Sequence, residues 1–407
     1  MATLSALKSW PLALGIFLLM LPVTAMVPLL HGLTEGRYPG LSELDRHLFM
    51  TVNMAGALLF AVLSGLLSDR LGQRKRLIVP ALAVNGLVLL LMGLHWPYPV
   101  YLGLRFIEGC AHMTALSLAM TLAADGARQG REGAALGLVG AAMSLGVASG
   151  AVLGGWIGAE TPERIFPWGG ALMLALAVLA AVVLGDAPVT RRPPGLRALI
   201  ELTLQRRPLL LPYAFTFVDR LTVGFIISTV SLYFATVLGF APARIGMVMA
   251  AFLLPFAALT FPAGVLCQRW DPFIMMAAGS ILYGGVLAGL GFAGASLVLP
   301  WMVAGGVVAA LMFAPSLVLA TRLADPAQRA TAMGGFHLAG SLGFMLGPMV
   351  GVGALAGLRA LGLEPYPGVF LLVGGLEVLC VLVCLPWLMR LRRATATNAV
   401  PEDVFLR

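Results

Sequence analysis

The chain has 407 residues, of which 60% are hydrophobic and only 11% are charged, and its mean hydropathy is +0.95. This composition excludes a soluble protein with a single globular core, because so much apolar sequence is typical of membrane-spanning segments. The net charge of +8 does not indicate nucleic-acid binding, because the cations lie in short segments beside apolar runs, where they set membrane topology.

Twelve apolar segments follow one another along the chain, and each is long enough to cross a bilayer, which takes about 20 residues in a helix. They lack the alternating apolar and polar residues that are typical of membrane strands, so the sequence predicts an all-α membrane protein. The expected spans are 10–30, 48–67, 77–95, 99–123, 134–158, 167–185, 209–237, 244–267, 273–294, 297–321, 331–356 and 367–389.

A polar stretch divides the first six spans from the last six. Lys and Arg are concentrated in the alternate connections that include 69–76, which places both termini in the cytoplasm. Within the linker, apolar residues between basic flanks predict a short helix on the membrane surface, with a solvated linker as the alternative. The expected domains are an N-terminal six-helix bundle at 1–185, a cytoplasmic linker at 186–208, a C-terminal six-helix bundle at 209–390 and a cytoplasmic tail at 391–407.

The connection between the second and third spans, GLLSDRLGQRKR at 65–76, is a compact cluster of charge between two apolar runs. Its pattern resembles the signature loop of the major facilitator superfamily of transporters, and it is carried by Gly65, Ser68, Asp69, Arg70, Gly72, Gln73, Arg74 and Lys75. The resemblance implies twelve helices in two six-helix bundles related by a pseudo-two-fold axis. It also implies a gating loop, whose candidate residues are Gly65, Asp69, Arg70, Gly72 and Arg74.

Three ionisable residues in the fourth span, Arg105, Glu108 and His112, are three and four residues apart and share one helix face. At about 1.5 Å per residue, Glu108 lies roughly 14 Å deep, near the middle of the bilayer. A charge there costs about 2.5–3.5 kcal/mol and needs a partner, which Arg105 can supply. The run at 105–109 also resembles a superfamily motif whose arginine is implicated in coupling. All three are therefore proton-coupling candidates, with a permanent structural ion pair as the alternative.

The fifth and eleventh spans carry glycines at the same spacing, which indicates an internal repeat of six spans. Glycines four residues apart allow another helix to approach closely, so we expect helix packing at Gly146, Gly150, Gly154, Gly343, Gly347 and Pro348. In the superfamily's antiporters a proline follows the third glycine of span five. That position is Ala151 in this chain, whereas the eleventh span keeps the glycine–proline pair.

The seventh span carries Asp219 and Arg220 near mid-depth. Neighbouring side chains on a helix point about 100° apart, so we do not expect these two to pair face to face. Asp219 is a second proton-coupling candidate, with a structural clasp as the alternative. The substrate-cavity candidates are Asn53 in the second span, Arg220, and the pair His337 and Ser341, which share a face of the eleventh span.

No nucleotide-binding loop, metal-ligand spacing or serine-elbow motif occurs in the sequence, so we expect no enzyme activity, no cofactor and no metal. The chain most resembles bacterial drug and metabolite exporters that run as proton antiporters. This resemblance implies proton-coupled efflux of a small molecule by alternating access. We expect a monomer in the lipid bilayer of the bacterial cytoplasmic (inner) membrane, with no nucleic-acid partner.

The first span has no acidic residue, although many proton-driven exporters of this kind use one there. A uniporter or a proton-symporting importer of a small metabolite is therefore the main alternative. A membrane sensor that does not transport is a third possibility, but such a protein gains little from a carboxylate in the middle of the membrane.

Overall fold

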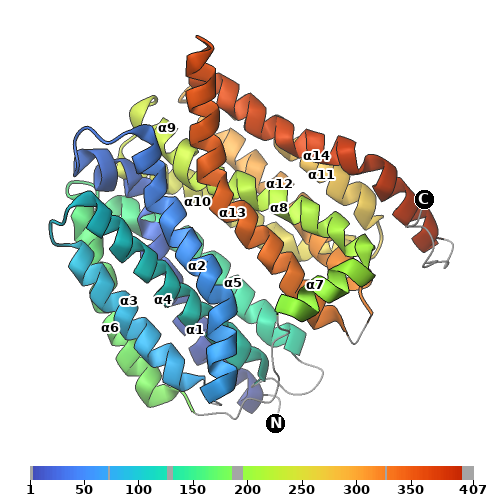
Figure 1. Cartoon of the computed structure of the whole chain (residues 1–407), viewed down its shortest axis with the longest axis horizontal. Helices are drawn as coiled ribbons and strands as arrows, with labels where there is room; N and C mark the ends of the chain where they lie inside the picture. Colours follow the sequence, from blue (N-terminus) through green and yellow to red (C-terminus); the bar gives the residue numbers. More distant parts are fainter. Residues whose placement is uncertain (1–2, 72–73, 126–131, 186–195, 326–327, 397–407) are drawn as a thin grey trace. The chain divides into compact units, whose positions relative to one another are not determined.

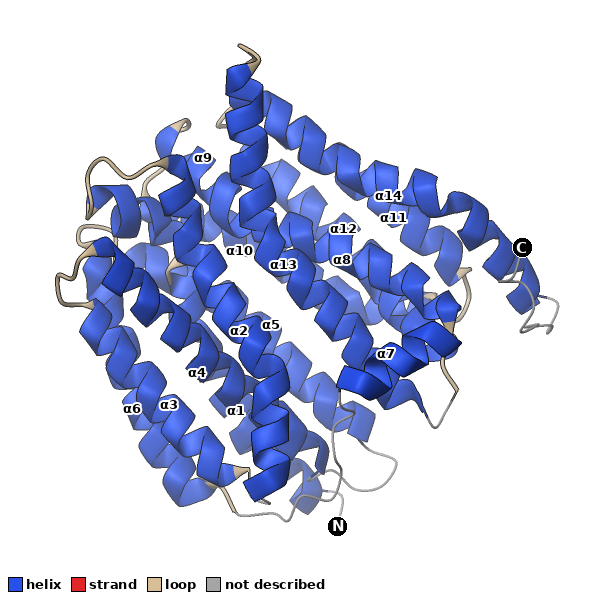
Figure 2. Cartoon of the chain, viewed as in Figure 1, coloured by secondary structure: helices blue, strands red, loops and turns tan. Residues whose placement is uncertain are grey.

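The computed structural model describes residues 3–71, 74–125, 132–185, 196–325 and 328–396. Across these residues the regular structure is helical and no strand occurs (Figure 2). Eleven segments of the described chain are long and apolar enough to cross a membrane. The remaining expected span, 48–67, lies within α2, the 29-residue helix Glu43–Leu71. The prediction of an all-helical membrane protein is confirmed.

The chain forms two compact units, each built from two stretches of sequence. The first unit contains Met1–Pro193 and Ile226–Leu254, and the second contains Pro194–Phe225 and Pro255–Arg407. One border follows α8, Leu210–Phe225, where the π-helical turn Ile226–Val230 interrupts the seventh span before α9, Ser231–Thr236. The other falls at Pro255 inside α10, Pro242–Leu266. The end of span seven and the start of span eight thus belong to the first unit, and the expected domain bounds 1–185, 186–208, 209–390 and 391–407 stay predictions.

The first unit contains α1 to α6 together with α9 and the first part of α10, and among α1 to α6 the closest helix pairs are α2 with α4, α1 with α5, and α3 with α4 and α6 (Figure 1). Glycines set the α1–α5 contact. A Cβ atom added at Gly146 would lie 2.6 Å from the Phe17 carbonyl oxygen, and one at Gly150 would lie 2.7 Å from that of Leu21. The remaining bounds are α1 Thr3–Ala25, α3 Lys75–Met92, α4 Tyr98–Asp125, α5 Glu132–Ile157 and α6 Ile165–Val183.

The second unit pairs α8 with α13, and α11 with both α12 and α14. The start of α11 is capped by Asp271, whose carboxylate accepts a 2.9 Å hydrogen bond from the Phe273 amide. The same carboxylate pairs with Arg392 of α14 at 2.5 Å, which ties the two helices together. The helix bounds are α7 Leu196–Gln205, α11 Pro272–Leu290, α12 Val298–Arg322, α13 Arg329–Ala360 and α14 Pro365–Ala396.

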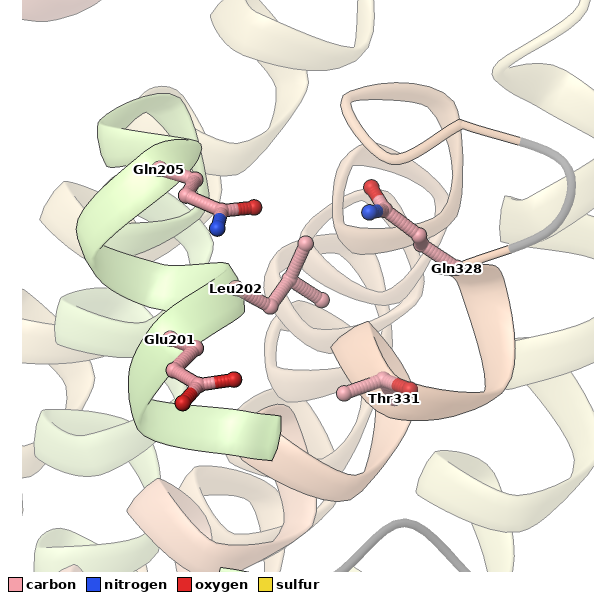
Figure 3. Close-up of a pocket in the computed structure, with 5 residues that line it drawn as sticks. All are labelled: Glu201, Leu202, Gln205, Gln328 and Thr331. Carbon is pink, nitrogen blue, oxygen red and sulfur yellow. The ribbon is translucent and has the colours of Figure 1, made fainter. Parts of the chain in front are cut away.

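The short helix expected in the linker is present as α7, and it packs against α13 within the second unit. Leu202 is 4% exposed and joins a buried apolar cluster with Tyr213 and Phe336. Around it lies a cavity of about 190 Å³, and Figure 3 shows polar side chains of α7 facing those at the start of α13 across Leu202. The lining residues are Glu201, Leu202, Gln205, Gln328 and Thr331.

An ion pair between Arg206, which directly follows α7, and Asp325, which lies shortly after α12, also holds α7 in place within the second unit. Because their side chains are 34% and 50% exposed, we expect Arg206→Ala to cost less than about 1 kcal/mol of unfolding free energy. Leu202→Ala should cost more, because it removes buried apolar contacts. Thermal unfolding of the purified protein compares the two. A larger loss for Arg206→Ala would mean that the ion pair, and not the leucine, holds the helix in place.

Candidate functional site

The first unit contains a buried ion pair on α4. The guanidinium of Arg105 contacts the carboxylate of Glu108 at 2.5 Å, and both side chains are 1% exposed. This is the contact that the three-residue spacing predicts. The Asn53 amide of α2 donates to the same carboxylate oxygen, and the Asn85 amide of α3 lies 3.5 Å from the Glu108 backbone carbonyl. The Arg105 guanidinium thus balances the carboxylate charge, and the Asn53 amide of α2 donates a hydrogen bond to the same group.

Close packing of α2 and α4 brings Asn53 to Glu108. A Cβ atom added at Gly109 would lie 2.9 Å from the Asn53 amide nitrogen, and one at Gly56 would lie 3.1 Å from the Cys110 sulfur. Any side chain at these positions would force the helices apart. The glycine that ends the 105–109 motif therefore has a physical role: it allows the amide to reach the carboxylate.

The other contacts of Arg105 are apolar or weakly polar. Its guanidinium carbon lies 4.8 Å from the centroid of the Phe49 ring, and its Nη2 atom lies 3.7 Å from the Met50 sulfur. His112 follows one turn after Glu108 and is 7% exposed. The site can therefore exchange a proton only if the surroundings of Glu108 open, because the carboxylate is enclosed in this conformation.

Asp219 and Arg220 diverge on α8. The Asp219 side chain is 4% exposed and that of Arg220 is 29% exposed. Their closest charged atoms, Oδ2 and Nε, are 3.9 Å apart, which is too long for a hydrogen bond. The Arg220 guanidinium carbon lies 4.4 Å above the Phe313 ring of α12, and its stem packs where α13 has Gly340. The two side chains therefore lie in different environments: Asp219 is buried, whereas Arg220 is partly exposed beside the Phe313 ring.

Arg220 belongs to a group that we call the arginine–aromatic patch, made of Arg220, Phe256, Phe313, Phe336 and His337. The Phe313 ring centroid lies 5.7 Å from that of Phe256 and 6.0 Å from that of Phe336. The Phe336 ring meets His337 edge to face at 5.9 Å. His337 is exposed, and Ser341 follows it one turn later on α13 with partial burial. The patch thus combines an accessible cation with aromatic rings.

A further buried carboxylate, Glu377 of α14, is a candidate that the sequence patterns above do not single out. It is 1% exposed, and its Oε1 atom lies 3.3 Å from the Thr222 hydroxyl of α8. Ser280 and Tyr283 of α11 are fully buried nearby and interact with it. The signal is visible in the sequence, because Glu377 is an acidic residue within the apolar segment 367–389.

The candidate gating loop is described only in part. The backbone from Gly65 to Leu71 belongs to the end of α2, and Arg74, which is 2% exposed, precedes α3. Gly72 and the side chains of Asp69 and Arg70 lie outside the described residues. The gating role of the loop stays a prediction.

The packing glycines of α13 lie against α8. A Cβ atom added at Gly347 would lie 2.6 Å from the Phe225 amide nitrogen, and one at Gly343 would overlap the Phe217 carbonyl. Pro348 lies inside α13 and follows this contact directly. A third packing glycine of α5, Gly154, would place a Cβ 2.5 Å from the Ala25 Cα of α1. In both units, then, the repeated glycines lie at close helix crossings.

Comparison with known proteins agrees with this architecture. The family model described as Major Facilitator Superfamily matches residues 12–218 and 213–404. The 3-(3-hydroxy-phenyl)propionate transporter of Escherichia coli (strain K12) is 28% identical over 348 residues, covering 83% of this chain and 85% of that protein.

Solved structures give the same fold at low sequence identity. A bacterial homologue of the human lysosomal transporter Spinster, in an inward-facing and unoccupied conformation, is 14% identical with a TM-score of 0.79, covering 98% of each chain. A point mutant of the nucleoside transporter NupG is 14% identical with a TM-score of 0.78, covering 93% of this chain and 99% of the other. The human organic anion transporter MFSD10 is 20% identical with a TM-score of 0.65 and the same coverage.

The two matches to the family model together extend over nearly the whole chain, and the similar proteins are transporters. The function is therefore transport across a membrane and not enzyme catalysis. The chain belongs to the Major Facilitator Superfamily.

Proposed function

We propose that the protein carries a small aromatic organic anion across the bacterial cytoplasmic membrane, coupled to protons, by alternating access. The observation that carries this proposal is the arginine–aromatic patch, in which the Arg220 guanidinium lies 4.4 Å from the Phe313 ring. A guanidinium binds a carboxylate through charge-assisted hydrogen bonds, and neighbouring rings stack against an aromatic body. The 28% identical relative transports 3-(3-hydroxyphenyl)propionate, which has both features.

Each candidate residue has a role in this proposal. Arg220 binds the substrate carboxylate, while His337 and Ser341, on the same helix face, offer hydrogen bonds to its polar substituents. Glu108, with Arg105 and His112 beside it on α4, is the first candidate for the coupled proton. A proton on Glu108 would weaken its contacts with Arg105 and Asn53. The helices of the first unit could then favour one arrangement when Glu108 is charged and another when it is neutral.

The direction follows from the charge of the substrate. The potential across a bacterial membrane is negative inside and opposes anion entry by about 2.3 kcal/mol per charge and 100 mV. An anion needs a co-transported cation to accumulate in the cell, whereas its export needs none. An aromatic anion therefore favours proton symport into the cell. Antiport efflux, which the sequence resemblance implies, and uniport are the alternatives.

Transport into vesicles separates the three cases. The protein is reconstituted into liposomes that contain a pH-sensitive dye, and labelled 3-(3-hydroxyphenyl)propionate is added outside, with protein-free liposomes as the control. Symport predicts uptake with acidification of the interior beyond the control. Antiport predicts alkalinisation, and uniport predicts uptake without a pH change beyond the control. Movement of a nucleoside or a lipophilic cation instead of the aromatic anion would overturn the proposed substrate class.

Arg220→Gln tests the patch itself. We expect KM for the aromatic anion to rise about tenfold or more, because a charged hydrogen bond contributes about 1.5–3 kcal/mol. Arg244→Gln is the matched control: the Arg244 guanidinium carbon lies 3.7 Å from the Phe240 ring in the first unit, so that variant loses the same kind of contact elsewhere. An equal rise of KM in both variants would contradict a specific role for Arg220.

A further inference from the structure

Two buried carboxyl groups of the second unit, Asp219 of α8 and Glu377 of α14, lie close enough to interact electrostatically, and Tyr283 of α11 interacts with both. The Thr222 hydroxyl oxygen lies 2.6 Å from the Asp219 backbone carbonyl oxygen and 3.3 Å from Glu377 Oε1. Asp219 Oδ2 is buried and has no hydrogen-bond partner among the described residues. Close packing brings Glu377 to α11, because a Cβ atom added at Gly284 would lie 3.1 Å from the Glu377 Cβ.

If Glu377 were ionised, the Thr222 hydroxyl could not donate a hydrogen bond to it. A hydroxyl has a single hydrogen, and the shorter contact of Thr222, at 2.6 Å, directs it to the Asp219 carbonyl. The contact with Glu377 would then bring two oxygens together with no hydrogen between them. A protonated Glu377 supplies that hydrogen and donates it to Thr222. The hydroxyl of Ser280 is fully buried and interacts with Glu377, but it makes no hydrogen bond of normal geometry among the described residues.

The balance of charges around Asp219 and Glu377 also favours a protonated carboxyl group. In the first unit, Arg105 balances Glu108 one to one. In the second unit, the guanidinium of Arg220 lies 3.9 Å from Asp219, and among the described residues no ion pair with Glu377 is found. Among the described residues, the other titratable groups near them are the Tyr283 hydroxyl of α11, the Cys380 thiol of α14 and, beside Arg220, His337 of α13. An uncompensated carboxylate inside a membrane protein is costly, and taking up a proton removes its charge.

We propose that Asp219 and Glu377 form a carboxyl pair that holds one exchangeable proton in the second unit. The proton comes from water and forms one O–H bond with a carboxylate oxygen, and no other covalent bond changes. Arg220 connects this pair to the patch, because a substrate carboxylate bound to the guanidinium weakens its hold on Asp219 and favours the protonated pair. This link is reciprocal, so the proton also favours anion binding. The link rests on the proposed function, whereas proton binding does not.

Infrared difference spectra of the purified protein in lipid, recorded between acidic and alkaline buffer, test proton binding directly. We expect a carbonyl band of a protonated carboxyl group that shifts in D₂O. The band should be lost in Glu377→Gln, altered in Asp219→Asn and retained in Glu364→Gln, which changes an exposed acid just before α14. Glu377→Asp keeps a carboxyl group and should keep the band, which separates proton loss from misfolding.

Three outcomes would overturn the carboxyl pair. One is a band that persists unchanged in both Glu377→Gln and Asp219→Asn. Another is a band lost only in Glu108→Gln, which would assign the proton to the first unit. A third is a band abolished by NaCl but not by choline chloride at the same pH, which would make the oxygen cluster a sodium site.

Proton uptake on anion binding tests the link through Arg220. The protein in weakly buffered detergent solution is mixed with 3-(3-hydroxyphenyl)propionate, and a pH indicator reports protons taken from solution. We expect uptake in wild type, and binding without uptake in Glu377→Gln. Binding without uptake in wild type would overturn the link. Absence of binding to wild type would contradict the proposed substrate class, while the infrared result would still decide the carboxyl pair.

Discussion

Replacing Arg105 with leucine should destabilise the protein by about 3–5 kcal/mol. The substitution leaves the Glu108 carboxylate, which is 1% exposed, without its counter-charge. The Asn53 amide still donates to that carboxylate, but a neutral amide does not balance a full charge. Unfolding of the purified protein, followed by heat or by titration with a denaturing detergent, measures the loss.

The double variant Arg105→Leu/Glu108→Leu removes both charges and should regain most of the lost stability, because apolar residues of similar volume replace buried ion pairs at little cost. Arg164→Leu provides the exposed control. Its ion pair with Glu160 has side chains that are 61% and 82% exposed, so its loss should be below about 1 kcal/mol. A double variant no more stable than Arg105→Leu would contradict this account.

The same pair of variants separates structure from transport. If Arg105 and Glu108 form only a structural clasp, the stable double variant should still move substrate with protons. If Glu108 carries a coupled proton, the double variant should fold but lose coupling, so that flux continues without the pH change in the vesicles. The comparison thus tests the two interpretations that the sequence left open for the fourth span.

Helix geometry explains why some of this site is predictable from sequence. The Arg105–Glu108 contact requires only that residues 105 and 108 lie on one α-helix, and the divergence of Asp219 from Arg220 follows from the turn per residue. The membrane spans are equally local, because about 20 apolar residues form a helix that can cross the bilayer. These features do not depend on which helices become neighbours.

The rest depends on tertiary packing that the single sequence does not specify. The Asn53 amide reaches Glu108 only because Gly56 and Gly109 allow α2 and α4 to meet closely. The border of the units within the seventh span falls at a π-helical turn, Ile226–Val230, for which the apolar run 209–237 gives no local signal. For Glu377, the sequence already shows an acidic residue within an apolar segment. The residues that contact it, however, depend on tertiary packing and cannot be predicted from the sequence.

The contact between α8 and α13 should be sensitive to a single methyl group. A Cβ atom at Gly343 would overlap the backbone carbonyl oxygen of Phe217 and lie 2.9 Å from its carbon, and backbone atoms cannot move aside as a flexible side chain can. We expect Gly343→Ala to cost about 1–3 kcal/mol through overpacking. Thermal unfolding of the purified protein measures this loss.

Gly353→Ala is the matched control, because it makes the same change on the same helix at a position where the added Cβ meets nothing within 4 Å. Alanine favours helix over glycine, so this variant should be as stable as wild type or slightly more stable. Gly343→Ala should also raise KM for the aromatic anion, because Arg220 packs against Gly340 of the displaced helix. Equal melting temperatures for the two variants would show that α8 and α13 can separate freely, and the repeated glycines would then need another explanation.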